Sequence, residues 1–222
     1  MLRNTGKCSV GFAAVTSGGA GRLLSAAHCD STGNVAWTDG NGDPLTNGGA
    51  DVSVQGPTLD SMRMDPVGGT AGWVHGGPWN ATSSTSRYHL KVAATGVNSV
   101  GDLICTSGMN TGENCNAQVI AVGVQRACPT PFNASQCTYD ELQSFGSFYA
   151  IIAKGDSGGP VYRPRSDGRV NASNIISGAP MDATVNCPSS MAYPGNTCFY
   201  QARVTPIRPV LTHWDLTIET TP

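Results

Sequence analysis

Short runs in which apolar residues alternate with small or polar ones dominate this sequence, as in Val10 to Val15 and Val119 to Val124. A period of two sends successive side chains to opposite faces of an extended strand, whereas the 28 glycines and 14 prolines spread between the runs favour turns. The pattern predicts an all-β protein of many short antiparallel strands. A chain of 222 residues is long enough to bury a sizeable core, as one domain or as two halves of roughly 100 residues each.

One stretch near the C-terminus departs from this pattern. Between Pro206 and Trp214 the apolar residues Ile207, Val210 and Leu211 recur at helical spacing. The spacing predicts one short helix at the end of the chain.

The six residues from Gly155 to Pro160, Gly-Asp-Ser-Gly-Gly-Pro, form a glycine-rich turn around one serine. A serine hydroxyl is a weak nucleophile until a base takes its proton, and an acyl-transfer oxyanion needs backbone N–H donors in fixed positions. Glycine lets the chain turn tightly around Ser157 and leaves room for a substrate. The motif therefore indicates a nucleophilic serine rather than an ordinary turn.

A histidine in a compatible setting lies far upstream. His28 follows the apolar run Gly21 to Leu24, which is short enough to be a buried strand, and it comes directly after two alanines and directly before Cys29. Small alanines allow close packing of the ring, and a disulfide at the cysteine would staple its loop. His28 is the candidate base.

The segments around His28 and Ser157 resemble the chymotrypsin-like serine peptidases, and more narrowly the secreted bacterial streptogrisin and alpha-lytic-type branch. The resemblance extends from Cys8 to about Trp214, although only the segments around His28 and Ser157 match the family's motifs closely. It implies two antiparallel β-barrels with the active site in the cleft between them and a closing C-terminal helix. We expect residues 1–100 to form the first barrel, carrying His28, and residues 101–222 to form the second, carrying Ser157.

The family also has an aspartate that orients the imidazole, placed between the histidine and the serine in sequence. Asp60 is the best candidate, because Leu59 to Met64 reads as the start of an alternating strand. Asp51, before another alternating run, and Asp65, before a proline, are the rivals. The resemblance then implies that His28 takes the Ser157 proton, that Asp60 stays ionised, and that the N–H groups of Gly155 and Ser157 form the oxyanion hole.

The family buries the carboxylate beside the nucleophile, here Asp156, and pairs it with a cation. Streptogrisin-like enzymes use an arginine just after the first cysteine of a small loop, but Thr106 stands at that position. An unpaired buried carboxylate is costly, so either a cation or a set of hydrogen bonds must reach Asp156. The possible cations are Arg126, Arg3 and Lys154.

Substrate preference is read from the residues before the serine. The family's pocket base corresponds to Ile151, followed by Ile152 and Ala153, and no acid stands there. We therefore expect small to medium apolar side chains before the cut rather than Lys or Arg. Lys154 corresponds to the pocket rim.

A second segment, after the serine, matches the family's substrate-binding edge, where an extended peptide adds as an antiparallel strand. Its candidate residues are Ser177, which we also expect near the triad aspartate, Gly178 and Ala179.

Eight cysteines fall into four close sequential pairs with no CxxC metal pair. Sequence alone leaves 105 pairings open. The family resemblance supports Cys8 with Cys29 and Cys105 with Cys115, and proximity suggests Cys128 with Cys137 and Cys187 with Cys198. Four disulfides would indicate an extracellular protein.

The net charge of −2 excludes a strongly basic nucleic-acid-binding protein, and no apolar run is long enough to span a membrane. We expect a secreted, monomeric serine endopeptidase that acts on polypeptides without metal or other cofactor. Family members are made with a signal and a pro-segment, which we expect to have been removed. Two alternatives remain open: a catalytically inactive homologue that binds peptides or a partner, and an esterase or other acyl hydrolase with the same triad.

Overall fold

The alternating runs of the sequence form strands in the computed structural model, which describes residues 2–3, 8–30, 36–39, 42–47, 52–54, 58–81, 88–129, 135–192 and 195–222. The strands are β1 (Leu2–Arg3), β2 (Ala13–Thr16), β3 (Gly21–Ser25), β4 (Thr38–Asp39), β5 (Val52–Val54), β6 (Met62–Met64), β7 (Trp73–Gly76), β8 (Tyr88–Thr95), β9 (Leu103–Gly108), β10 (Gly112–Ala127), β11 (Gln136–Ser144), β12 (Ile152–Ala153), β13 (Pro160–Pro164), β14 (Val170–Gly178), β15 (Thr184–Val185), β16 (Cys198–Phe199), β17 (Gln201–Pro206) and β18 (Leu216–Ile218). The α-helix α1 (Ile207–Trp214) and the 3₁₀ turns η1 (Ala27–Cys29) and η3 (Met181–Ala183) complete the described elements.

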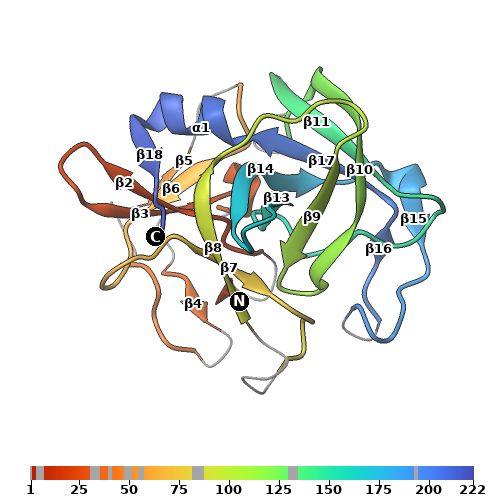
Figure 1. Cartoon of the computed structure of the whole chain (residues 1–222), viewed down its shortest axis with the longest axis horizontal. Helices are drawn as coiled ribbons and strands as arrows, with labels where there is room; N and C mark the ends of the chain where they lie inside the picture. The colour runs from red at the N-terminus through yellow and green to blue at the C-terminus, as the bar shows by residue number, and fades with distance from the viewer. Residues whose placement is uncertain are drawn as a thin grey trace.

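One sheet gathers the N-terminal strands together with the last strand of the chain. Its order is β18-β2-β3-β6-β5, and every pairing is antiparallel. In Figure 1, blue β18 accordingly lies beside red β2. The C-terminus is thereby anchored to the half of the molecule that contains the N-terminal strands.

The second sheet closes on itself. Its strands follow the order β13-β9-β10-β11-β17-β14-β8-β7, and β13 also pairs with β14, so six strands form a ring. Cyan β13 and β14 lie near the centre of Figure 1, with green β9, β10 and β11 to their right. Inward-facing apolar residues fill this barrel, among them Ile104, Leu142, Val161 and Ile176. Closure removes the exposed sheet edges that an open antiparallel sheet would leave.

The helix predicted at the C-terminus is confirmed, from Ile207 to Trp214. Ile207, Val210 and Leu211 are buried and contact the same core cluster as β2 and β14, because helical spacing puts them on one face. Within the described residues, no helix has the length and apolar content needed to cross a membrane.

Four disulfides join the cysteines in the predicted pairs. They are Cys8–Cys29, Cys105–Cys115, Cys128–Cys137 and Cys187–Cys198, and they leave no free cysteine. Each closes a short loop, so these bonds hold local turns rather than the two sheets together.

The all-β fold with a short C-terminal helix is thus confirmed. The division of the chain at residue 100 stays a prediction. Strand pairing crosses that boundary in both directions, because β8 pairs with β14 and β18 pairs with β2.

Candidate active site

His28 lies at the end of a strand, in the short turn η1 directly after β3. Ala26 and Ala27 are fully buried behind the turn, and Cys29 is bonded to Cys8. The small side chains and the disulfide therefore fix the backbone from which the imidazole projects.

Asp60 holds His28 through two hydrogen bonds, one to its backbone and one to its imidazole. The His28 backbone N–H donates to Oδ1 at 3.0 Å, and His28 Nδ1 lies 2.8 Å from Oδ2. Burial by itself lowers the pKa of His28, but the charge of Asp60 and the hydrogen bond to it outweigh burial, so the pKa lies above its ordinary value of 6.5. This arrangement leaves Nε2 as the nitrogen available to a substrate or nucleophile.

The Asp60 carboxylate is completely buried just before β6, and it receives a further donor from the other sheet. The Ser177 hydroxyl at the end of β14 donates to Oδ2. The expectation that Ser177 lies near this aspartate agrees with the contact. A buried carboxylate with several donors stays in one orientation, so the imidazole that it holds is also fixed.

The rival aspartates differ from Asp60. Asp65 forms an ion pair with Arg22 at 2.7 Å on the partly exposed face of the first sheet. Asp51 lies outside the described residues. Of the two described candidates, only Asp60 contacts His28.

Ser157 lies in the loop between β12 and β13, where the glycines adopt left-handed conformations. The φ angle is +97° at Gly155 and +85° at Gly158. A Cβ on Gly158 would also approach Ser25 Oγ to 2.1 Å and the Ser9 carbonyl oxygen to 2.2 Å. Only glycine fits this turn, because a side chain would be both strained and sterically excluded.

The Ser157 hydroxyl points toward the Ser177 carbonyl oxygen at 3.5 Å, and it makes no hydrogen bond to His28. Both residues nevertheless line the same cavity. Catalytic hydrogen bonds are often unformed in ligand-free enzymes and tighten when substrate binds. Rotation about the Cα–Cβ bond of Ser157 is the change that would redirect this hydroxyl.

Two backbone N–H groups remain available beside the serine. Within the described residues, neither the Gly155 N–H nor the Ser157 N–H donates to an acceptor, whereas the carbonyls of both residues accept hydrogen bonds from Ser9. The two donors therefore suit a developing oxyanion, as the sequence predicts.

Asp156 is fully buried and is held by neutral donors. Its carboxylate accepts the Asn110 N–H at 2.9 Å, the Thr111 hydroxyl at 2.7 Å and the Ala153 N–H at 2.8 Å. Burial raises the pKa of Asp156 to about 6, and these hydrogen bonds lower it only in part. Of the two alternatives left by the sequence, the described contacts favour the set of hydrogen bonds.

The described side chains proposed as cations for Asp156 lie elsewhere. Arg126 pairs with Glu141 at 3.2 Å, and the Lys154 side chain is exposed. The side chain of Arg3 is outside the described part of the structure. Thr106, which replaces the family's arginine, donates its hydroxyl to the Ile151 carbonyl at 2.7 Å instead.

A cavity of about 320 Å³ lies beside His28 and Ser157. Its walls include the predicted Ile152, Ala153, Lys154, Gly178 and Ala179, together with Ile176, Met181, Thr197 and Phe199. Ile151, the predicted pocket base, does not line it: this side chain is fully buried in the core of the second barrel. Ile152 and Phe199 are among the apolar residues that do line the cavity.

Sequence reasoning missed Phe199 because no motif signals it. Its place depends on the antiparallel pairing of β12 with β16, which sets Phe199 opposite Ile152. The cysteine beside it, Cys198, was the only local clue that this segment lies near the pocket.

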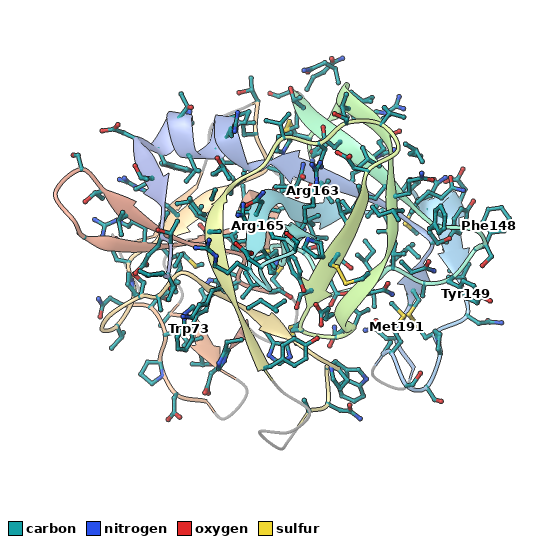
Figure 2. The ribbon with its side chains drawn as sticks, in the orientation of Figure 1. Trp73, Phe148, Tyr149, Arg163, Arg165 and Met191 are labelled. Carbon is teal, nitrogen blue, oxygen red and sulfur yellow. A yellow bond between two sulfur atoms is a disulfide. The ribbon has the colours of Figure 1, made fainter. Side chains whose placement is uncertain are left out.

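A separate apolar surface lies at the end of the molecule that carries β15. Phe148 and Tyr149 point outward there (Figure 2), and with Val185 and Pro188 they border a second cavity of about 510 Å³. The two cavities share no lining residue, so these aromatic side chains are outside the His28 and Ser157 site.

Metal-ligand atoms come together at two places in the described residues, around Cys8, His28 and Cys29 and around Cys105, Glu113 and Cys115. All four cysteines are in disulfides, so neither group offers a thiolate.

A sequence relative is found among known proteins. No family profile matches the chain. Streptogrisin-C of Streptomyces griseus is 28% identical over 221 residues, which make up 99% of this chain and 39% of that protein. The chain thus spans about two fifths of the length of the curated relative that it matches.

Solved structures share the fold. The Nocardiopsis protease NAPase has a TM-score of 0.67 at 20% identity, with 99% of this chain and 96% of that chain covered. A glutamic acid specific serine protease has a TM-score of 0.66 at 21% identity, covering 98% and 96% of the two chains. These likenesses show that the chain shares its fold with bacterial serine proteases.

Proposed function

We propose that the protein cleaves peptide bonds through a catalytic triad of Ser157, His28 and Asp60. The observation that carries the proposal is the pair of hydrogen bonds from His28 to the buried Asp60, on a histidine that lines one cavity with Ser157. An imidazole held in this way is oriented to accept a serine proton and is stabilised when it becomes charged.

The reaction proceeds in two acyl-transfer steps. His28 Nε2 takes the Ser157 proton as the hydroxyl oxygen attacks the substrate carbonyl carbon, and the Gly155 and Ser157 N–H groups stabilise the oxyanion. His28 then protonates the leaving amine. Water attacks the acyl-enzyme by the same route, and Asp60 remains ionised throughout.

The cavity supports a preference for an apolar side chain before the cut. Ile152, Ile176 and Phe199 supply buried apolar walls, so an aliphatic substrate side chain would lose its contact with water on binding. Ala179 adds a methyl group to the wall, in keeping with small to medium side chains.

The nature of the pocket also argues against acidic substrates. The glutamic acid specific serine protease that shares the fold uses a histidine triad in substrate binding. Among the described residues that line the cavity of this chain, His28 is the only histidine, and Lys154 is the only other cationic side chain. We therefore propose a substrate class different from that of this structural neighbour.

We propose that the enzyme acts outside the cell on polypeptides. Four disulfides support an oxidising compartment, and the sequence relative is a bacterial streptogrisin. Monomeric action and the removal of a signal and pro-segment stay predictions from the family resemblance.

Covalent labelling with a fluorophosphonate probe tests the proposal. The wild-type protein is expected to be labelled and to hydrolyse a peptide library, whereas Ser157→Ala loses both activities because no oxygen nucleophile remains. Ser166→Ala, at an exposed turn serine, is the matched control and should behave as wild type.

Each alternative function has its own outcome in this experiment. Absence of labelling in a folded wild-type protein would favour the inactive homologue, for which the Ser157 hydroxyl turned toward Ser177 is the one supporting observation. Labelling with hydrolysis of simple esters but of no peptide would favour an esterase.

A further inference from the structure

The loop that carries Ser157 is anchored by hydrogen bonds to the turn between β9 and β10. Asn110 and Thr111 in this turn donate to the Asp156 carboxylate, and the Asn110 side-chain amide donates to the Lys154 carbonyl at 2.7 Å. Thr111 is 2% exposed and Asp156 is 0% exposed, so water does not compete for the bond between these two side chains. The turn and the loop are thereby joined through a buried hydrogen bond.

Ser9 also holds the same loop. Its hydroxyl donates to the Gly155 carbonyl at 3.2 Å and accepts the Met109 N–H at 2.9 Å, while its backbone N–H donates to the Ser157 carbonyl at 2.6 Å. The carbonyls on both sides of the oxyanion donors are therefore engaged, and the donors themselves are left for the substrate. Any loosening of Asp156 would release part of this arrangement.

No described element that contacts Asp156 presents a charged group to it. The β9–β10 segment contributes Gly108, Asn110 and Thr111, and β12 contributes Ala153. Gly108 packs so closely that a Cβ there would lie 2.1 Å from the carboxyl carbon. Space for the side chain of a cation is therefore lacking on the Gly108 side.

The Thr111 hydroxyl is the only described side-chain donor to this carboxylate. It shares Oδ2 with the Ala153 N–H, whereas Oδ1 accepts from the Asn110 N–H. Hydrogen bonds to an ionised acceptor are roughly twice as strong as neutral ones. Among these donors, the Thr111 hydroxyl is therefore the one that a side-chain substitution can remove without changing the backbone.

We propose that Thr111 is a positioning residue for the catalysis proposed above: its hydroxyl holds the ionised Asp156 carboxylate in place of an ion pair, and so keeps the Gly155 and Ser157 N–H groups aimed at the oxyanion. The proposal rests on the proposed function and adds to it a residue that does not touch the substrate.

Protonation of Asp156 would oppose this arrangement. A protonated carboxyl oxygen becomes a donor, so the Thr111 hydroxyl, which can accept as well as donate, would have to reverse its direction. The bond that Thr111 donates to the ionised carboxylate is then lost. Because burial raises the pKa of Asp156 to about 6, this loss falls within the pH range in which the enzyme can be assayed.

The test compares Thr111→Val, which keeps the shape and removes the hydroxyl, with Thr111→Ser, which keeps the hydroxyl. For Thr111→Val we expect kcat on a peptide substrate to fall about tenfold with KM nearly unchanged, because oxyanion stabilisation acts on the transition state. We also expect the acid limb of its kcat–pH profile to move to higher pH, because the ionised carboxylate has lost a donor. Thr111→Ser should restore both properties.

Three results would overturn the proposal: wild-type kcat and pH profile in Thr111→Val, an equal defect in Thr111→Ser, or a defect confined to KM. If Thr111→Val does not fold, Thr111→Ala replaces it, with the same expected loss of kcat and the same shift of the acid limb. An unchanged profile in Thr111→Ala would also overturn the proposal.

Unfolding experiments separate this proposal from the proposed function. The loss of unfolding free energy in Thr111→Val should be larger at pH 8, where Asp156 is ionised, than at pH 4, where it is protonated. A loss that does not depend on pH would overturn the link between Thr111 and the carboxylate. If the wild type hydrolyses no peptide, the proposed function fails, yet the unfolding comparison still tests this link.

Discussion

Two fully buried carboxylates lie at the candidate site, and their hydrogen-bond partners differ in charge. Asp60 lies beside an imidazole that can become charged, whereas Asp156 is surrounded by N–H and O–H groups that carry no charge. Burial raises the pKa of Asp156 to about 6, whereas the charge of Asp60 helps to raise the pKa of His28 above 6.5. Burial alone therefore does not decide the role of a carboxylate, because the charge of its neighbours is equally important.

The two carboxylates also belong to different parts of the fold. Asp60 precedes β6 in the first sheet and is reached by Ser177 from the second, so it lies where the two sheets meet. Asp156 lies within the second half, and all its described donors come from β12 and the β9–β10 turn. We therefore expect substitutions at Asp60 to affect proton transfer and those at Asp156 to affect oxyanion geometry.

Asp60→Asn should have the largest effect and so test the first half of this comparison. An amide cannot stabilise the charged imidazole and favours the wrong tautomer, so kcat should fall about 10⁴-fold. Steady-state kinetics on a peptide substrate measure the fall. Asp65→Asn, at the surface ion pair with Arg22, is the matched control and should lose less than about threefold. Equal activities in the two variants would contradict the assignment of Asp60.

Asp156→Asn should have the next largest effect, about 10²-fold in kcat, because one amide NH₂ must face a donor and displace the oxyanion loop. Single-turnover acylation rates measure it. A loss seen only in KM would show that Asp156 acts on substrate binding instead.

The same variant should change how stability depends on pH. Because the folded-state pKa of Asp156 is raised from 3.8 to about 6, its stabilising contribution is complete below pH 3.8 and is lost as pH rises through 6. This rise in the pKa of Asp156 corresponds to about 3 kcal/mol of unfolding free energy, which is an upper estimate for a buried group. Urea unfolding measures the free energy of unfolding at pH 4 and at pH 8, and the difference between the two values should be smaller in Asp156→Asn than in wild type. An unchanged difference would mean that another group is responsible for the pH dependence.

Ser9→Ala should have a smaller effect, about tenfold in kcat. It removes the hydroxyl bond to the Gly155 carbonyl but keeps the backbone bond to the Ser157 carbonyl, so the loop is loosened rather than released. The kcat and KM values for the variant check this, with the exposed Ser17→Ala as control. A loss of kcat as large as that of Asp156→Asn would mean that the Ser9 hydroxyl contributes most to holding the loop.

Lys154→Gln should have the smallest effect, less than about threefold, because an exposed lysine at the rim of the cavity is screened by solvent and salt. The change should be confined to peptides with an acidic side chain before the cut, and it should vanish in high salt. A larger loss that persists in salt would assign Lys154 a direct contact with the substrate.

Local patterns in the sequence predicted the elements of the site well. The glycine-rich turn around Ser157 and the alanines before His28 are both short-range features, so their conformations could be read directly. The structure brings Asp60 onto His28 and puts Ser157 in the same cavity, while the catalytic roles of the three residues stay predictions.

Contacts between distant segments were harder to predict. Thr106 was identified as an unusual residue, but nothing local indicated that Asn110 and Thr111 would reach Asp156, 45 positions or more away in the chain. Ile151 was placed at the pocket base by position alone, whereas the register of β12 with β16 puts Phe199 opposite Ile152 there.

The amino-acid sequence by itself determined the all-β character, the short helix and the choice of Ser157 and His28 as candidate nucleophile and base. These features depend on side-chain periodicity and on a few consecutive residues. Only the tertiary structure decided which donors surround Asp156 and which side chains line the cavity. Such contacts depend on strand register and barrel closure, which bring together residues that no local pattern connects.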